Sequence, residues 1–308
     1  MRVTQSMLSS NMLRNLNNSY GKMSKYQEQL QSGKLVNRPS DDPVIAVKGM
    51  GYRVDLDKNV QFQRNIGEAH SWLDSTDESL GQVGEALKRV KELIVQAAND
   101  TNTPEDRQKI NAEISQIKNQ LQDIGNSKIG ENYIFSGTHT NQPLYKDGLP
   151  NPDATLTQKG LGEKIEINVF DGINMQINTN GNDLFKDIDS FMGKLETILN
   201  DPAMTGKDIG EALGATITDG TSTIPGLDAL TEKTLTLRAE VGARQNRVEM
   251  MENRLSLQEV NVTKQMSQNE DTDFAKTITD MVTQESLHQA ALSVGAKVIQ
   301  TTLVDFIR

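Results

Sequence analysis

A run of regularly spaced apolar residues between positions 66 and 97 constrains the fold of this chain more than any other feature. Such spacing places every member on one narrow face of an α-helix, as in a coiled coil. The run is longer than a typical globular helix, so it predicts one long helix over residues 43–99. The members alternate at spacings of three and four, and only one is polar: Ile66, Ala69, Leu73, Thr76, Leu80, Val83, Leu87, Val90, Ile94 and Ala97.

A similar but shorter pattern occupies the N-terminal segment and predicts a helix with a single apolar stripe. This helix is expected to end at Ser32-Gly33, because two prolines and several turn formers follow over residues 37–43. Asp42 is then placed as the N-cap of the long helix, with Pro43 at its first position. The stripe consists of Leu13, Leu16, Tyr20, Met23, Gln27 and Leu30.

Three more helices are predicted from the same kind of spacing. The first begins at the cap Thr103-Pro104, with a stripe at Ile110, Ile114, Ile117, Leu121 and Ile124. The second begins at Leu227, where the helical spacing resumes, and has a seam at Leu230, Thr234, Leu237, Val241, Arg244, Val248, Met251, Leu255, Gln258 and Val262. Residues 269–273 interrupt it, and a last helix follows, with candidate buried positions at Phe274, Ile278, Met281, Leu292 and Ile299.

The middle of the chain has a different character and predicts a β-containing module. Alternating residues 164–170 and 173–177 flank Asp171-Gly172, which indicates a β-hairpin. A short helix is expected around residues 187–199. Residues 200–226 are rich in Gly, Thr and Asp and are interpreted as a loop.

Together these patterns predict a mainly α fold with an inserted β-containing module. The helices are expected to form an elongated antiparallel helical bundle or coiled coil built from both chain ends. Residues 1–42 and 271–308 are expected to form paired terminal helices. Residues 43–134 and 227–270 are expected to form a long helical bundle domain, and residues 135–226 the inserted outer module. Because neither end buries its stripe well alone, both ends are expected to be loosely ordered until a partner covers them.

Composition narrows the possible functions. The net charge of −10 argues against broad nucleic-acid binding, which needs clustered Lys and Arg. The hydrophobic share of 35% favours thin helical packing over one large core. The absence of cysteine excludes disulfides and thiolate metal sites. We find no apolar stretch long enough to span a membrane and no apolar core of a signal peptide at the N-terminus.

The sequence offers no catalytic, cofactor-binding or metal-binding residues, so we do not expect an enzyme. His70, His139 and His288 share no metal-binding spacing. Asp271 and Asp273 are placed like the start of a calcium loop, but the Gly and the terminal Glu of such a loop are missing.

Ordered motifs at both ends of the chain resemble the bacterial flagellin family. Near the N-terminus these motifs are Ser32-Gly33, Asn37-Arg38 and Asp41-Asp42. Near the C-terminus they are the run from Arg238 to Arg247 and the Asp271-x-Asp273-x-Ala275 pattern. The resemblance covers residues 1–135 and 227–308. Within the family, the segments Arg2-Val3-Thr4, Asp41-Asp42-Pro43 and Phe170-Asp171-Gly172 favour a subunit of the junction between hook and filament.

The resemblance implies a structural subunit of the extracellular flagellum, secreted unfolded through the flagellar type III channel. It implies four partners: other copies of the chain in a ring-like layer, the first hook-associated protein, flagellin, and a flagellar export chaperone. Neither nucleic-acid binding nor membrane insertion is expected. A minor flagellin, a coiled-coil interaction or signalling protein, and an enzyme hosted by the middle module are the alternatives.

Eight apolar residues near the two chain ends are the predicted assembly residues, expected to be buried at subunit contacts. The alternative is that they pack only within one subunit. They are Leu13, Leu16, Met23, Leu30, Leu292, Ile299, Leu303 and Phe306.

Overall fold

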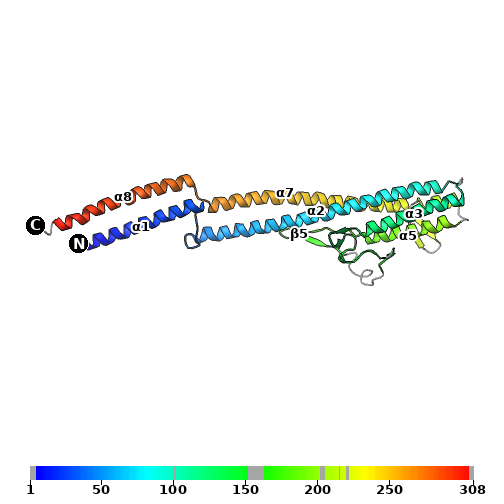
Figure 1. The fold of residues 1–308 in the computed structure, drawn as a ribbon, viewed down its shortest axis with the longest axis horizontal. Coiled ribbons are helices and arrows are strands. Elements are labelled where there is room, and N and C mark those ends of the chain that lie inside the picture. The colour runs from blue at the N-terminus through cyan, green and yellow to red at the C-terminus, as the bar shows by residue number, and fades with distance from the viewer. Residues whose placement is uncertain are drawn as a thin grey trace. The chain divides into compact units, whose positions relative to one another are not determined.

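The structure is a computed structural model that describes residues 5–99, 102–146, 148–151, 163–201, 205–214, 216–219 and 222–304. Most of these residues are helical (Figure 1). The helices are α1 (Gln5–Ser32), α2 (Pro43–Ala97), α3 (Pro104–Gly125), α5 (Asn182–Asn200), α6 (Gly206–Glu211), α7 (Leu227–Glu270) and α8 (Phe274–Val304). A mainly α fold with a β-containing insertion is thereby confirmed. Within the described ranges, no helix is both long enough and apolar enough to cross a membrane.

The chain divides into two compact units. The terminal unit combines residues 1–59 with residues 257–308, and the central unit comprises residues 60–256. Helices α2 and α7 each contribute to both units. The two ends of the chain therefore fold together, as antiparallel pairing of the amphipathic ends predicts.

The central unit has a continuous apolar core, and its seams are those expected from the sequence. All ten positions of the seam between Ile66 and Ala97 are buried, including Thr76, whose hydroxyl donates to the Trp72 carbonyl at 2.7 Å. The five stripe positions of α3 are buried as well. On α7, Leu227, Leu230, Thr234, Val241, Val248 and Leu255 are buried.

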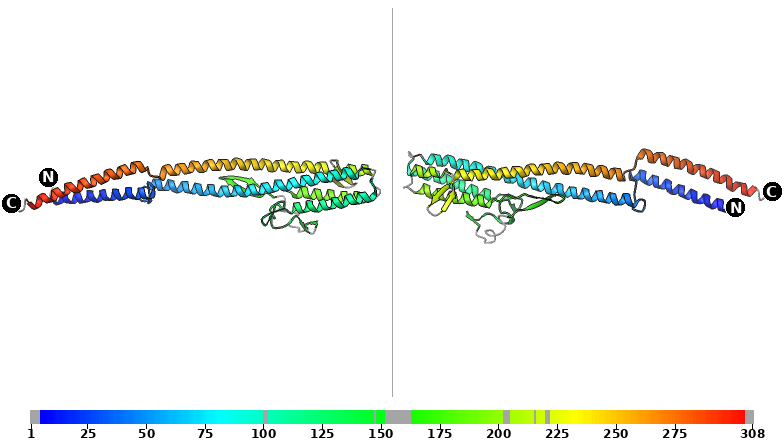
Figure 2. Two further views of the ribbon diagram at one scale, coloured as in Figure 1. Left: turned by 45° about the horizontal axis from the view of Figure 1, so that its top comes forward. Right: turned by 180° about the vertical axis from the view of Figure 1, so that it is seen from behind.

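Polar contacts set the antiparallel register of α2 and α7 in the central unit. The Arg238 guanidinium binds the Asp77 carboxylate through two hydrogen bonds, of 2.9 and 3.0 Å. Lys91 pairs with Asp228 at 3.1 Å further along the two helices. Figures 1 and 2 show the two helices side by side and α3 beside α5 in every view.

The strands of the central unit form four separate antiparallel pairs. The pair β5–β6 is the hairpin expected at Asp171-Gly172, and Gly172 has φ +73°, which favours glycine at this turn. Phe170 anchors the hairpin, because it stacks on Phe62 at 6.1 Å and lies 4.1 Å under the Arg254 guanidinium. The strands are β1 (Lys128–Ile129), β2 (Asn132–Tyr133), β3 (Tyr145–Lys146), β4 (Leu149–Pro150), β5 (Glu166–Phe170), β6 (Ile173–Gln176), β7 (Thr216–Asp219) and β8 (Ser222–Pro225).

The interpretation of residues 200–226 as loop is wrong for much of that range. Helix α6 begins there because Thr205 and Asp208 form a capping box, in which each side chain binds the other residue's backbone N–H. Strands β7 and β8 pair directly after it. The preceding helix α5 begins at Asn182, five residues before the expected start.

The terminal unit pairs α1 with α8, which lie side by side in Figures 1 and 2. Helix α1 ends at Ser32 as expected, and Gly33 follows with φ +70°. Asp42 caps α2, since its carboxylate accepts from the backbone N–H groups of Val44 and Ile45 at 3.0 and 3.1 Å. The expected burial on the last helix is wrong for Phe274 and Ile278, which are 53% and 49% exposed, and Leu292, which is also a predicted assembly residue, is 49% exposed in the single chain.

Replacing Leu80 by Ala should destabilise the central unit by ~2–5 kcal/mol, because it opens a cavity in the buried seam. Urea unfolding followed by the fluorescence of Trp72, the only tryptophan and a neighbour of this core, measures the change. The matched control Val95→Ala, at a position 56% exposed, should change stability by no more than about 0.5 kcal/mol. Equal effects of the two substitutions would contradict the assigned core.

Candidate assembly site

The two chain ends meet where α1 gives way to α2 and α7 gives way to α8. The backbone N–H of Leu35 donates to the Glu270 carbonyl at 2.6 Å, and the N–H of Thr272 donates to the Gly33 carbonyl at 3.0 Å. These bonds form an isolated antiparallel bridge between Lys34 and Asp271. Residues 237 positions apart in sequence are thus joined through their backbones. We refer to residues 33–35 and 270–272 as the joint.

The Glu270 carboxylate lies at the centre of the joint, and its side chain is only 8% exposed. Arg53 contacts it at 2.7 Å and Lys34 at 3.5 Å, so the buried negative charge is paired with two cations. Gly49 makes room for this carboxylate, because a Cβ at that position would overlap it. The joint therefore requires a glycine on α2 opposite a buried acid on α7.

Asp271 closes the exposed side of the joint. Its carboxylate accepts from the Lys34 ammonium and from the Ser267 hydroxyl, both at 2.6 Å. The hydrogen bond from Lys34 and then that from Ser267 lower the pKa of Asp271 below its ordinary value. The same hydrogen bond raises the pKa of Lys34. Both groups therefore stay charged across the neutral range.

Polar contacts also order the helix ends at the joint and join α1 to α8. Two local contacts fix the ends of the helices at the joint: the buried hydroxyls of Thr272 and Thr277 lie 2.8 Å apart before and within α8, and the Gln29 amide of α1 donates to the Leu35 carbonyl at 2.7 Å. Further along, the Gln284 amide donates to the Ser19 hydroxyl at 2.8 Å. Among the described side chains of the terminal unit, those that are fully buried are polar: Gln29, Asn59, Glu270, Thr272 and Thr277.

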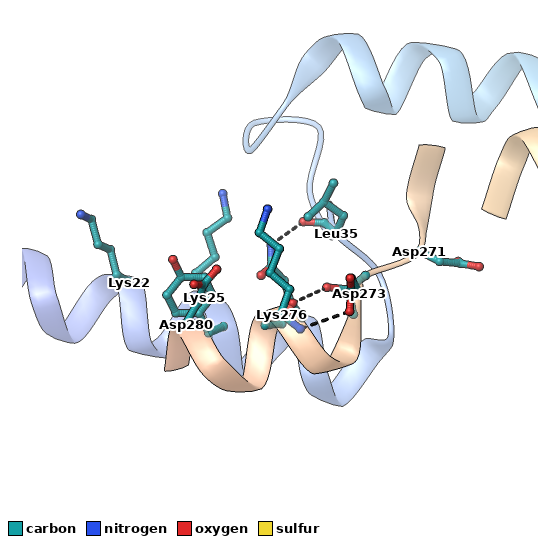
Figure 3. A pocket seen from close by; sticks show the side chains of 11 residues that line it. Lys22, Lys25, Leu35, Asp271, Asp273, Lys276 and Asp280 are labelled. Carbon is teal, nitrogen blue, oxygen red and sulfur yellow. Dashed lines mark hydrogen bonds between the residues drawn. The ribbon is translucent and has the colours of Figure 1, made fainter. Parts of the chain in front are cut away.

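A groove of about 580 Å³ runs between α1 and α8 beside the joint (Figure 3). Lys22 and Lys25 line it from α1, Lys276 and Asp280 line it from α8, and Asp273 lines it from the residue before α8. Within the described ranges, no group of three His, Cys, Asp or Glu side chains is arranged to hold a metal ion.

Large exposed apolar side chains concentrate in the terminal unit. Among the described residues, sixteen of the twenty-one exposed large hydrophobic side chains belong to it, whereas every buried hydrophobic side chain lies between Ile66 and Leu255 in the central unit. A monomer rarely exposes so many apolar groups on one unit without an interaction partner. We call these sixteen side chains the apolar surface of the terminal unit: Met7, Leu13, Tyr20, Leu35, Val44, Val47, Met50, Val54, Leu257, Val260, Phe274, Ile278, Val282, Leu287, Leu292 and Val294.

The predicted assembly residues fall into three groups in the structure. Leu13 and Leu292 are exposed, at 60% and 49%, and belong to the apolar surface. Leu16, Met23 and Leu30 are half-buried along α1. The side chains of Ile299 and Leu303, and the whole of Phe306, lie outside the described residues.

Sequence reasoning missed the joint and part of the apolar surface. The ion pairs of Glu270 and Asp271 join distant parts of the chain, so no local pattern indicates them. By contrast, Val44, Val47 and Val54 follow a spacing of three and seven on α2 that is visible in the sequence.

Comparison with known proteins places this arrangement in a family. The description "Bacterial flagellin N-terminal helical region" matches residues 3–140, and "Bacterial flagellin C-terminal helical region" matches residues 224–307. The chain belongs to the bacterial flagellin family. The matched ranges include the whole joint and both terminal helices.

Two similar proteins and one solved structure show how much of the chain the similarity covers. Flagellar hook-associated protein 3 of Escherichia coli is 27% identical over 94% of this chain and 95% of its own length. A Bacillus subtilis flagellin is 27% identical over 97% of each chain. The crystal structure of Bacillus cereus FlgL has the same fold, with a TM-score of 0.54 and 22% identity over 70% of this chain and 99% of its own.

Acid should weaken the joint through Asp271. The lowered pKa means that the folded state binds the Asp271 proton more weakly than the unfolded state, so the stabilisation is present above about pH 4 and is lost as pH falls through the folded-state pKa. Hydrogen exchange of the Leu35 and Thr272 amides should therefore be slower in the parent than in Asp271→Asn at pH 6. The two proteins should converge as the pH falls below the folded-state pKa of Asp271. A difference that persists at low pH would exclude this ion pair as the cause.

Proposed function

We propose that this flagellin-family chain is a structural subunit of the bacterial flagellum that forms the junction between hook and filament. Copies assemble through the terminal unit after secretion. One observation carries the proposal: the described terminal unit buries no apolar side chain and exposes sixteen large ones. Fully burying a Val, Leu, Ile or Met side chain contributes ~1.5–3 kcal/mol of free energy. At a position that is half exposed, about half of this free energy can still be gained when a partner covers the side chain. If all sixteen side chains were covered, the apolar surface would contribute ~12–24 kcal/mol, against the ~4–15 kcal/mol that association costs.

The distribution of charge supports assembly through the terminal unit rather than the central one. Residues 1–59 and 257–308 carry thirteen Lys and Arg against twelve Asp and Glu, a net charge of +1. The remaining nineteen basic and thirty acidic residues give residues 60–256 a net charge of −11. Copies of the terminal unit can approach closely without net repulsion, whereas central units repel one another over a Debye length.

The relatives support the junction over the filament as the place of assembly. Proteins named flagellar hook-associated protein 3 from Escherichia coli and Salmonella typhimurium match nearly the full chain. In this proposal the partners are other copies in a ring-like layer, the first hook-associated protein on one side and flagellin on the other. A flagellar export chaperone binds the chain before secretion. The equal identity to a Bacillus subtilis flagellin makes a minor filament subunit the second candidate.

Deleting the gene should leave complete hooks without filaments, with flagellin released into the medium. This result is expected because flagellin cannot polymerise on the hook when the junction is missing. Electron microscopy of the cells and an immunoblot of the medium give the result, and a plasmid copy of the gene serves as the control by restoring filaments. Normal filaments in the deletion strain would refute the junction role, and altered filaments of normal length would favour the minor flagellin.

Removing residues 299–308 should abolish assembly and leave the central unit folded. The segment contains the predicted assembly residues Ile299, Leu303 and Phe306, whereas the central core lies between Ile66 and Leu255. Urea unfolding followed by Trp72 fluorescence should match that of the full chain, while flagella lack the truncated protein. As a matched control, Thr301→Ala with Thr302→Ala leaves the apolar residues in place and should assemble. A truncated protein that still builds the junction would overturn this assignment.

A further inference from the structure

Met12 of α1 packs directly on the backbone of α8 at Gly295. A Cβ at position 295 would overlap the terminal methyl group and the sulfur of Met12, so this side chain fills the space that any residue other than glycine would occupy. Gly295 is buried and Met12 is half-buried. The Met12 sulfur therefore lies in a close contact between two helices from opposite ends of the chain.

The Met12–Gly295 contact is apolar, whereas the other contacts along this helix pair involve polar groups. Toward the joint, α1 and α8 are also connected by the Gln284–Ser19 hydrogen bond of 2.8 Å and by the rings of Tyr20 and His288, whose centroids are 6.4 Å apart. Met12 lies about two turns beyond Ser19, ~10 Å further from the joint. The contact therefore helps to hold together the outer part of the α1–α8 pair.

Methionine is the side chain of this protein that peroxides oxidise most readily, because the chain has twelve methionines and no cysteine. Three methionines are more than half exposed, so a sulfoxide there stays in water: Met7, Met50 and Met250. Met12 differs from these three, because its sulfur lies against the backbone of α8. The N–H groups around Gly295 belong to the interior of that helix and are bonded within it.

We propose that Met12 is an oxidation site and that its sulfoxide opens the outer part of the α1–α8 pair. With hydrogen peroxide as the oxidant, the Met12 sulfur attacks one peroxide oxygen and the O–O bond breaks. The sulfur keeps that oxygen and loses two electrons, and the other oxygen leaves as water with both protons. An apolar thioether thereby becomes a polar sulfoxide.

The sulfoxide opens the pair because its oxygen is a strong hydrogen-bond acceptor in a place without a free backbone donor. A polar group held in such a contact without a partner is unfavourable, so the oxidised side chain turns toward water and leaves Gly295. The joint stays closed, because the ion pairs of Glu270 and Asp271 contain no group that peroxide oxidises. The outer part of the pair separates while the part next to the joint stays paired.

The consequence for assembly rests on the proposed function. The terminal unit carries the apolar surface through which copies assemble in that proposal, and an opened pair presents this surface in a different arrangement. Subunits that carry the Met12 sulfoxide are then left out of the flagellum. Methionine sulfoxide reductases return the sulfoxide to the thioether, so the exclusion is reversible until the subunit is secreted.

A disulfide placed across the helix pair tests the opening in the purified full chain. Ser19→Cys and Gln284→Cys supply the only two thiols, on side chains that already contact each other. Their equilibrium with a glutathione buffer measures how often the helices lie together. Met12→Gln stands in for the sulfoxide, because peroxide would also oxidise the thiols, and Met12→Leu is its apolar control. We expect the disulfide to be several-fold less favoured in Met12→Gln than in Met12→Leu.

The same two substitutions at Met250, which is 62% exposed in the central unit, should leave the disulfide equilibrium unchanged. Equal equilibria for Met12→Gln and Met12→Leu would overturn the proposed opening. This comparison needs no assembly, so its result does not depend on the junction role.

Mass spectrometry of the parent chain tests the oxidation and its effect on assembly. Cells are grown with sublethal hydrogen peroxide, and the chain in isolated flagella is compared with the chain in the medium. We expect Met12 sulfoxide to be several-fold enriched in the medium and Met250 sulfoxide to be equal in both. Unoxidised Met12 beside oxidised Met250 would overturn the oxidation site, and equal Met12 sulfoxide in both fractions would overturn its effect on assembly. Absence of the chain from flagella would refute the proposed function, and the disulfide comparison would still decide the opening.

Discussion

Two antiparallel helices bury only the faces that they turn toward each other, and this limit shapes the terminal unit. In the central unit, α3, α5 and the β5–β6 hairpin add further layers around α2 and α7, so a continuous apolar core forms. The described terminal unit has no such layer. Its helices are joined by polar contacts, among them the Gln284–Ser19 hydrogen bond and the ion pairs of Glu270, and sixteen large apolar side chains stay exposed. The missing layer is what other copies supply in the proposed assembly.

This division explains why the sequence predicts one unit better than the other. Every position of the seam from Ile66 to Ala97 is buried, because neighbours within the same chain cover that face completely. The stripe of α1 has the same spacing, but Leu13 and Tyr20 are 60% and 64% exposed. Periodicity indicates which face is apolar and does not indicate whether a partner in the same chain covers it.

Other features were hidden for different physical reasons. The joint depends on Lys34 meeting Asp271 and Arg53 meeting Glu270, and contacts over more than 200 residues leave no local pattern. Helix α6 was not predicted, because residues 200–226 are rich in Gly, Thr and Asp, which favours a loop. The Thr205 and Asp208 capping box that begins the helix has a spacing that is visible in the sequence. The hairpin at Asp171-Gly172 was predictable because the turn itself demands a positive φ.

The polar character of the joint follows from the same limit. A buried ion pair usually contributes less stability than well-packed apolar residues of similar volume, so Glu270 with Arg53 and Lys34 is not the most stabilising choice. Apolar residues at these positions would, however, offer the exposed apolar side chains of α2 and α7 a surface within the same chain to pack against. In the polar joint, Gly49 lies against the Glu270 carboxylate, and the large apolar side chains of the adjoining helices face outward. The chain thereby keeps its apolar surface available for neighbouring copies.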